Sequence, residues 1–161
     1  MRKFVLVMLC LLATVGAKAQ FENGKWFVNT YVTGLDLSYS KGDKGHFGFE
    51  GAVGHFLLDN LALIADVGAD WSSPRDSYKL GAKARYYFSQ TGIYLSGGLK
   101  LASVQYKHEK KQTDVAMLLE TGYAYFVNRF ITIEPAIYYD LSFKDSDWSR
   151  IGLKIGLGFY F

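Results

Sequence analysis

The C-terminal segment of the sequence, residues 150–161, alternates between two kinds of side chain. One register is apolar throughout and comprises Ile151, Leu153, Ile155, Leu157, Phe159 and Phe161. The other register holds two basic residues, three glycines and Tyr160. Because successive side chains of a β-strand point to opposite faces, this segment predicts a strand with one apolar face and one polar or very small face. A strand that crosses a membrane has this character, with lipid on one side and a polar lumen on the other.

The N-terminal residues 1–19 predict a signal peptide that is removed on export. Two basic residues precede an apolar run over 4–15, and Ala17-Lys18-Ala19 supplies the small residues of a cleavage site. The alternative is a membrane anchor, but the 12 residues of this run fall short of the roughly twenty that a spanning helix needs. We therefore expect Cys10 to be lost with the signal peptide and residues 20–161 to form the mature domain.

The remaining chain is balanced in charge and lacks cysteine. Three of the 18 basic residues lie within 1–19, so residues 20–161 carry 15 basic and 15 acidic side chains. This balance gives no support for nucleic-acid binding, and no disulfide chemistry remains. No apolar segment after residue 20 approaches the length of a spanning helix. If the chain enters a membrane, we expect it to do so as a closed barrel.

The pattern predicts eight strands, joined by turns and loops, and no confident helix. Their expected ranges are 26–39, 46–56, 61–71, 77–88, 93–106, about 114–124, 130–143 and 150–161. The connections alternate in length, as short periplasmic turns and longer extracellular loops do in bacterial barrels. Short turns fall at 58–60, 89–92 and 128–129, and longer loops at 41–45, 72–76, 107–112 and 144–147. The fold prediction is all-β: an eight-stranded, antiparallel, up-and-down transmembrane β-barrel with short periplasmic turns.

The expected strands include one assignment of side-chain direction and two irregularities. In the first strand the alternation places Tyr31, with two leucines, on the apolar face. In the fifth strand Val104 and Tyr106 fall in the wrong register, which predicts a bulge near Ala102. Pro135 cannot donate a ladder hydrogen bond, so a second bulge is expected there.

Charged side chains within the strands share the non-apolar register with most of the strand glycines. In a soluble sandwich, the alternative, a charged face would meet water, whereas glycines are expected where eight strands enclose a narrow interior. We therefore expect the charges to pair inside the barrel, since removing one partner of a buried pair costs about 3–5 kcal/mol. The expected lumenal charge network comprises Glu50, Asp66, Lys83, Arg85, Lys100, Glu120, Glu134 and Lys154. A lumen filled in this way is plugged.

Five motifs carry a resemblance to a known family. They lie at 54–63, 84–88, 120–126, 133–136 and 156–161, and together they span most of the mature chain. The chain resembles the small outer-membrane β-barrel family typified by outer-membrane proteins A and X. The resemblance implies the outer membrane of a Gram-negative cell and a terminal strand read by the barrel-assembly machinery, with Leu157, Phe159 and Phe161 as the assembly signal. No peptidoglycan-binding domain is expected, because the chain ends with the barrel.

The function expected from this fold is that of an integral outer-membrane protein with a structural or surface-interaction role and a charge-plugged lumen. The first alternative is a narrow-pore porin, in which the lumenal charges line a water path. The second is a lipid-modifying enzyme, which needs a general base, usually histidine. His46, His55 and His108 are scattered, and none adjoins a serine in a recognisable motif. We therefore expect no enzymatic activity, no catalytic or metal-binding residues and no cofactor.

The expected partners are outer-membrane lipid, lipopolysaccharide and the assembly machinery, with no nucleic acid and an unidentified surface ligand as a further possibility. Lys107, Lys110 and Lys111 offer charges for the phosphates of lipopolysaccharide, although a charged run in a loop is more often simply solvated. Localisation in the cell outer membrane follows from the signal peptide and the strand pattern together.

Overall fold

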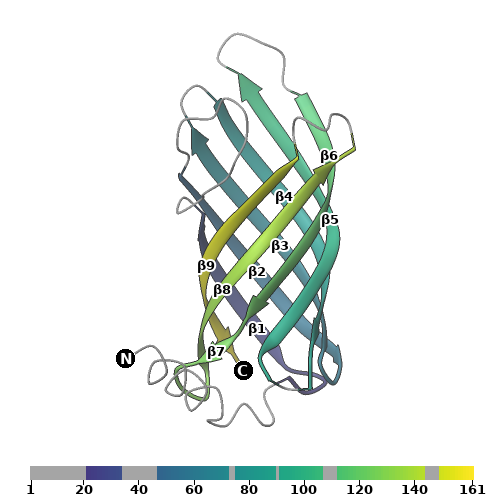
Figure 1. Ribbon diagram of the computed structural model, residues 1–161, viewed down its shortest axis with the longest axis vertical. Helices are drawn as coiled ribbons and strands as arrows, with labels where there is room; N and C mark the ends of the chain where they lie inside the picture. The colour runs from purple at the N-terminus through teal and green to yellow at the C-terminus, as the bar shows by residue number, and fades with distance from the viewer. Residues whose placement is uncertain (1–20, 34–46, 73–74, 90, 107–111, 144–148) are drawn as a thin grey trace, which may run out of the picture.

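The computed structural model describes residues 21–33, 47–72, 75–89, 91–106, 112–143 and 149–161. Several expectations lie outside these residues: the signal peptide at 1–19, the loops at 41–45 and 144–147, residues 107–111 of the loop expected at 107–112, and the histidines His46 and His108. The described part of the chain is all-β (Figure 1). None of its residues belongs to a helix long and apolar enough to cross a membrane.

Nine strand segments are present, and wherever they are described their ends lie within two residues of the expected positions. They are β1 (Trp26–Thr33), β2 (Phe47–Leu58), β3 (Leu61–Ser72), β4 (Arg75–Tyr87), β5 (Ile93–Tyr106), β6 (Gln112–Tyr123), β7 (Tyr125–Phe126), β8 (Ile131–Ser142) and β9 (Arg150–Tyr160). Only Ala124 separates β6 from β7, and both pair with β8 in one register. The nine segments therefore make eight strands.

The strands close into a barrel in which every pair is antiparallel. Each strand pairs with its sequence neighbour from β1 to β6, β1 also pairs with β9, and β9 pairs with β8. The pairing of β6 with β8 closes the circle. The prediction of an eight-stranded, antiparallel, up-and-down barrel is confirmed. Figure 1 shows the strands tilted around a common axis, with the β2–β3, β4–β5 and β7–β8 hairpins at one end, which we call the turn end.

The two faces of the barrel divide as the alternation predicts. Along β9 the apolar register of 151–159 is exposed on the outside, while Lys154 and the glycines are buried inside. The same division holds along β4, where Leu80 and Tyr86 are exposed and Lys83 and Arg85 are buried. Exposed aliphatic and aromatic side chains of this kind occur on all eight strands and form what we call the apolar belt.

The expected orientation of the first strand is wrong. Tyr31 is fully buried inside the barrel, as are Phe27 and Asn29, whereas Trp26 and Val32 are exposed on the outside. Both registers of β1 contain apolar residues, so hydrophobicity alone does not distinguish its two faces. The inward orientation of Tyr31 is stabilised by hydrogen bonds between its hydroxyl group and polar side chains inside the barrel, which are described below.

The expected bulges near Ala102 and at Pro135 are also wrong. Pairing of β5 with β4 and β6 runs without a shift of register past Ala102. With 14 residues, β5 is longer than the roughly nine to eleven that cross the hydrocarbon, so its last residues are not required to alternate. Pro135 stays in register with Ile155 of β9. On the other side, its missing donor coincides with the gap between β6 and β7, where pairing with β8 is interrupted.

Candidate functional site: the interior of the barrel

The interior at the turn end is filled by aromatic rings. Phe21, in the segment before β1, is fully buried and stacks on Tyr87, with ring centroids 3.9 Å apart. Its carbonyl oxygen accepts a hydrogen bond from the Asn60 backbone N–H at 2.7 Å, which ties this segment to the β2–β3 hairpin. Phe56, Phe126 and Tyr160 pack around the Phe21 ring, and Phe27 of the same cluster packs against Phe56 and Tyr160. We call these rings the aromatic plug.

Above the aromatic plug, the Glu134 carboxylate of β8 is fully buried and surrounded by donors. Its two oxygens accept hydrogen bonds at 2.7–3.0 Å from Asn29, Tyr31, Arg85, Thr132 and Tyr160. These donors come from five different inward-facing positions on four strands, because the barrel curves its strands around the carboxylate. A buried carboxylate with this number of partners has its desolvation offset by charge-assisted hydrogen bonds.

Arg85 of β4 connects Glu134 to the rest of the interior. Its guanidinium forms ion pairs with Glu134 at 3.0 Å and with Glu120 at 2.9 Å. The guanidinium carbon lies 3.9 Å from the ring centroid of Tyr94, close enough for a cation–π interaction. The remaining donors reach the hydroxyl groups of Ser96, Tyr31 and Tyr87 at 2.9–3.3 Å.

Glu120 of β6 is the centre of the charge network. It contacts three cations, with N–O distances of 2.8 Å to Lys83, 2.9 Å to Arg85 and 3.0 Å to Lys154. It also accepts a hydrogen bond from the Tyr94 hydroxyl at 3.0 Å. The four ionised groups come from β4, β6 and β9, which lie on different sides of the interior, so the ion pairs cross the barrel from wall to wall.

The network extends from Lys83 and Lys154 to two further acids. Lys154 lies 3.1 Å from Glu50, and Lys83 lies 3.6 Å from Glu50 and 3.9 Å from Asp66. Seven of the eight expected network residues are thus connected through described contacts. The eighth, Lys100, is also buried inside the barrel, but the contact described for it is a separate ion pair with Asp140 at 2.5 Å.

Glycines in the inward register give these long side chains their space. A Cβ on Gly156 would overlap the Tyr31 ring, and a Cβ on Gly54 would overlap the Phe27 ring. A Cβ on Gly98 would meet the backbone of Ala82 and Lys83 on the neighbouring strand. At these three positions the packing is therefore close enough that even one added methyl group would displace a neighbour.

Sequence reasoning missed the aromatic and hydroxyl members of the interior. Tyr31, Tyr87, Tyr94 and Tyr160 are all buried, and their hydroxyl groups bond to the ionised groups or to one another. The signal for three of them was available, because Tyr87, Tyr94 and Tyr160 share the register of the charged residues on their own strands. Phe21 carried no such signal, since it precedes the first strand.

The alternative of a lipid-modifying enzyme names three histidines, of which the structure describes His55. His55 lies outside the lumenal network: its ring stacks on Trp26, with centroids 4.4 Å apart, and its Nδ1 lies 3.2 Å from the Lys25 carbonyl oxygen. In the described part of the chain, no three residues of the metal-binding types gather around one point. The arrangement inside the barrel is one of mutual pairing, in which each cation described above has an acid as its neighbour.

Comparison with known proteins places this architecture among solved barrels. No protein-family model matches the sequence, and no curated protein sequence matches it significantly. The N-terminal β-barrel domain of Pseudomonas aeruginosa OprF aligns with a TM-score of 0.69 at 16% identity, covering 86% of this chain and 98% of that one. Neisserial surface protein A aligns with a TM-score of 0.68 at 20% identity, covering 86% of this chain and 100% of that one.

A third similar structure is Ail, the attachment invasion locus protein of Yersinia pestis, with a TM-score of 0.55 at 14% identity, covering 86% of this chain and 99% of that one. At these identities the likeness concerns the fold. The resemblance expected from the sequence is confirmed at that level: the chain has the fold of the small, eight-stranded outer-membrane β-barrels.

Proposed function

We propose that this protein is an integral barrel of the bacterial outer membrane, with a structural or surface-interaction role, a plugged lumen and no enzymatic activity. The fold and the apolar belt support the membrane location. An exposed surface made of leucine, isoleucine, valine and aromatic side chains on every strand suits lipid, because large contiguous apolar surfaces are unfavourable in water.

The observation that carries the plugged lumen is the set of ion pairs that cross the interior. Glu120 joins cations from β4 and β9, and Glu134 joins Arg85 to β1 and β9. The aromatic plug fills the turn end below them. A continuous water path would have to separate these groups, and removing a partner from a buried charge costs about 3–5 kcal/mol. The plug is therefore the state that the paired charges favour.

The proposed partners are the membrane lipids, lipopolysaccharide and the barrel-assembly machinery. For assembly we propose β9 as the signal, with Leu157, Phe159 and Phe161 as the recognised side chains, all of which are exposed on the outside of the barrel. The basic loop at 107–111, the proposed contact for lipopolysaccharide phosphates, lies outside the described residues.

The membrane location is tested by fractionation and heat-modifiable gel migration. We expect the protein in the outer-membrane fraction, with faster migration when unboiled, because a closed barrel resists detergent at room temperature. If the protein were found in the soluble periplasm, without a shift on boiling, the apolar belt would be covered by something other than membrane lipid, and the proposal would be wrong.

The plugged lumen is tested by planar-bilayer recording on refolded protein. We expect no reproducible conductance steps at neutral pH. Regular steps that change in size in the Lys83→Met variant would show a pore lined by the network, and the narrow-pore function would replace the plug. Unchanged lipid A mass spectra on overexpression are expected as well, and a new lipid A species would refute the absence of enzymatic activity.

A further inference from the structure

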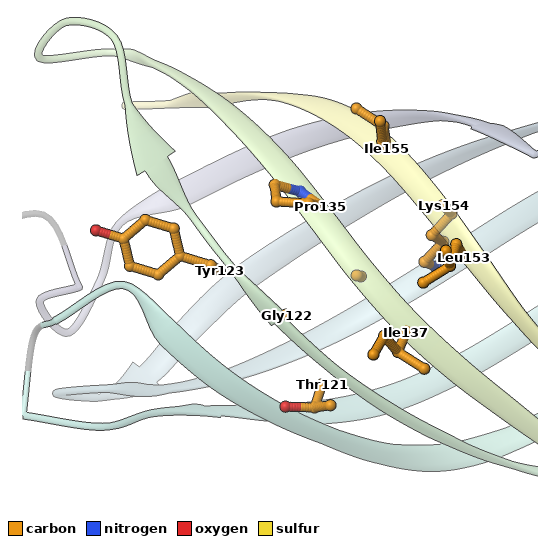
Figure 2. Close-up of a pocket in the computed structure, with 9 residues that line it drawn as sticks. Thr121, Gly122, Tyr123, Pro135, Ile137, Leu153, Lys154 and Ile155 are labelled. Atoms are coloured by element: carbon orange, nitrogen blue, oxygen red, sulfur yellow. The ribbon is translucent and has the colours of Figure 1, made fainter. Parts of the chain in front are cut away.

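A groove interrupts the apolar belt where β6, β8 and β9 lie side by side (Figure 2). Its outward-facing walls are formed by Thr121, Tyr123, Pro135, Ile137, Leu153 and Ile155. Its volume is about 470 Å³, within the roughly 300–1,000 Å³ range of small-ligand sites. Carbon atoms provide nearly all of its surface, so its occupant has to be apolar.

The groove exists because short side chains are surrounded by long ones. Thr121 and Pro135 are compact, while Ile137, Leu153 and Ile155 stand up from the neighbouring positions (Figure 2). Thr121 pairs with Ile137 across β6 and β8, and Pro135 pairs with Ile155 across β8 and β9. The depression is therefore a consequence of the sequence at these cross-strand pairs.

The backbone holds this shape in place. Pairing of β6 with β8 stops at Gly122–Ala136 and resumes at Tyr125–Ile133, on either side of Pro135. Between these pairs, the Ala124 N–H donates to the Gly92 carbonyl oxygen at 2.8 Å, in the register that pairs β6 with β5. On the lumenal side of the groove, a Cβ on Gly122 would lie 2.6 Å from the Tyr94 hydroxyl oxygen and 2.7 Å from the Pro135 carbonyl oxygen, so this position on β6 has no room for a larger residue.

We propose that the groove binds one acyl chain of a phospholipid in the periplasmic leaflet, an inference that rests on the proposed location in the outer membrane. Lipid tails are as apolar as the belt, so the preference cannot come from hydrophobic burial. It comes from dispersion, because a chain in a concave groove touches protein carbon on three sides, whereas elsewhere on the convex belt it touches one.

The position of the groove identifies the leaflet and the direction of the lipid. Tyr123 and Tyr125 lie at its turn end, with ring centroids 6.4 Å apart, and Figure 2 shows the Tyr123 hydroxyl pointing away from the groove toward that end. Tyrosine rings favour the level of the lipid headgroups. A phospholipid whose headgroup lies beside these two hydroxyl groups places its acyl chain along Pro135 and Ile137.

The test is native mass spectrometry of protein inserted into vesicles of phosphatidylethanolamine and phosphatidylglycerol and then extracted in mild detergent. Thr121→Phe fills the groove. Thr121→Val keeps the groove but removes the hydrogen bond that the Thr121 hydroxyl donates to the Tyr94 carbonyl oxygen at 3.0 Å. Ala84→Phe adds the same ring on the belt at β4, where Ala84 is exposed and is not among the residues that line the groove.

We expect one phospholipid retained by the unmodified protein, by Thr121→Val and by Ala84→Phe, and about fivefold lower retention by Thr121→Phe. Equal retention by Thr121→Phe, or no retained phospholipid on an inserted protein, would overturn the inference while leaving the proposed location intact. A dimer mass that Thr121→Phe abolishes would assign the groove to a second copy instead. Failure of all four proteins to insert, seen as no gel shift on boiling, would overturn the proposed function together with the inference.

Discussion

At the scale of single residues, Glu120 shows how a barrel interior makes buried charge tolerable. One carboxylate serves three cations at 2.8–3.0 Å, and Tyr94 supplies a further donor. Its neighbours Lys83 and Lys154 share Glu50 as a second acid. Removing the charge of Glu120 therefore leaves three buried cations with fewer partners, whereas the contact described for Asp114, the Ser142 hydroxyl, involves none of these three cations.

We predict that Glu120→Gln lowers the free energy of unfolding by about 3–5 kcal/mol, the usual cost of breaking a buried ion pair from one side. Asp114→Asn is the matched control. Asp114 is also buried, but the partner described for it is the Ser142 hydroxyl at 2.7 Å, and loss of one such bond costs about 1 kcal/mol. Urea unfolding in lipid vesicles measures both. An equal loss of unfolding free energy in the two variants would show that the three ion pairs of Glu120 do not stabilise the barrel more than the single hydrogen bond of Asp114 does.

At the scale of elements, the segment before β1 acts as part of the barrel although it is not a strand. Phe21 places a fully buried ring among residues of β2, β4, β7 and β9. Its backbone binds the β2–β3 hairpin, and the Gly24 N–H donates to the Phe56 carbonyl oxygen at 2.9 Å. The segment thereby packs into the turn end of the interior.

We predict that Phe21→Ala lowers the free energy of unfolding by about 3–5 kcal/mol, because it leaves a cavity in the aromatic plug that the surrounding rings cannot fill. Phe130→Ala is the control, since Phe130 lies at the same end of the barrel but is 60% exposed. We expect it to cost less than half as much, because an exposed ring leaves no cavity. If urea unfolding gave the same loss for both, Phe21 would not be a structural part of the plug.

At the scale of the whole molecule, the protein is arranged with its charges inside and its apolar side chains outside. The apolar belt runs around the outside of the barrel on all eight strands, while lysine, arginine and glutamate side chains pair in the interior. In a water-soluble protein, the effect of a new charge on the outside would not depend on its height along the barrel. In a bilayer that effect depends strongly on depth.

We predict that Leu99→Arg costs about 2–4 kcal/mol of unfolding free energy, and that Val127→Arg costs about 0–1 kcal/mol. The two native side chains are equally exposed, at 57% each, but Leu99 lies in the middle of β5 and Val127 lies beyond β7 at the turn end. Denaturant unfolding in vesicles gives both values. Similar costs at the two positions would indicate a surface in contact with water and would count against the membrane location.

Prediction from sequence succeeded where period-two alternation was unambiguous. In β4 and β9 every outward and inward position whose side chain the structure describes agrees with the prediction, because lysine, arginine and glycine lie in one register and leucine and isoleucine in the other. It failed at Tyr31, since β1 carries apolar residues in both registers. It also failed at Pro135. A strand can accommodate a proline without a bulge, where the neighbouring strand on one side is unpaired at that position.

The sequence by itself determined the number of strands, their approximate ends and the face on which most charges lie, because side-chain direction in a strand depends only on local position. Tertiary structure alone decided which charges meet. Glu134 and Arg85, 49 residues apart, become neighbours only when β4 and β8 face each other across the closed barrel. The same closure brings Phe21 against Tyr87 and forms the groove at Pro135, because curvature and register between distant strands are properties of the assembled sheet rather than of any one segment.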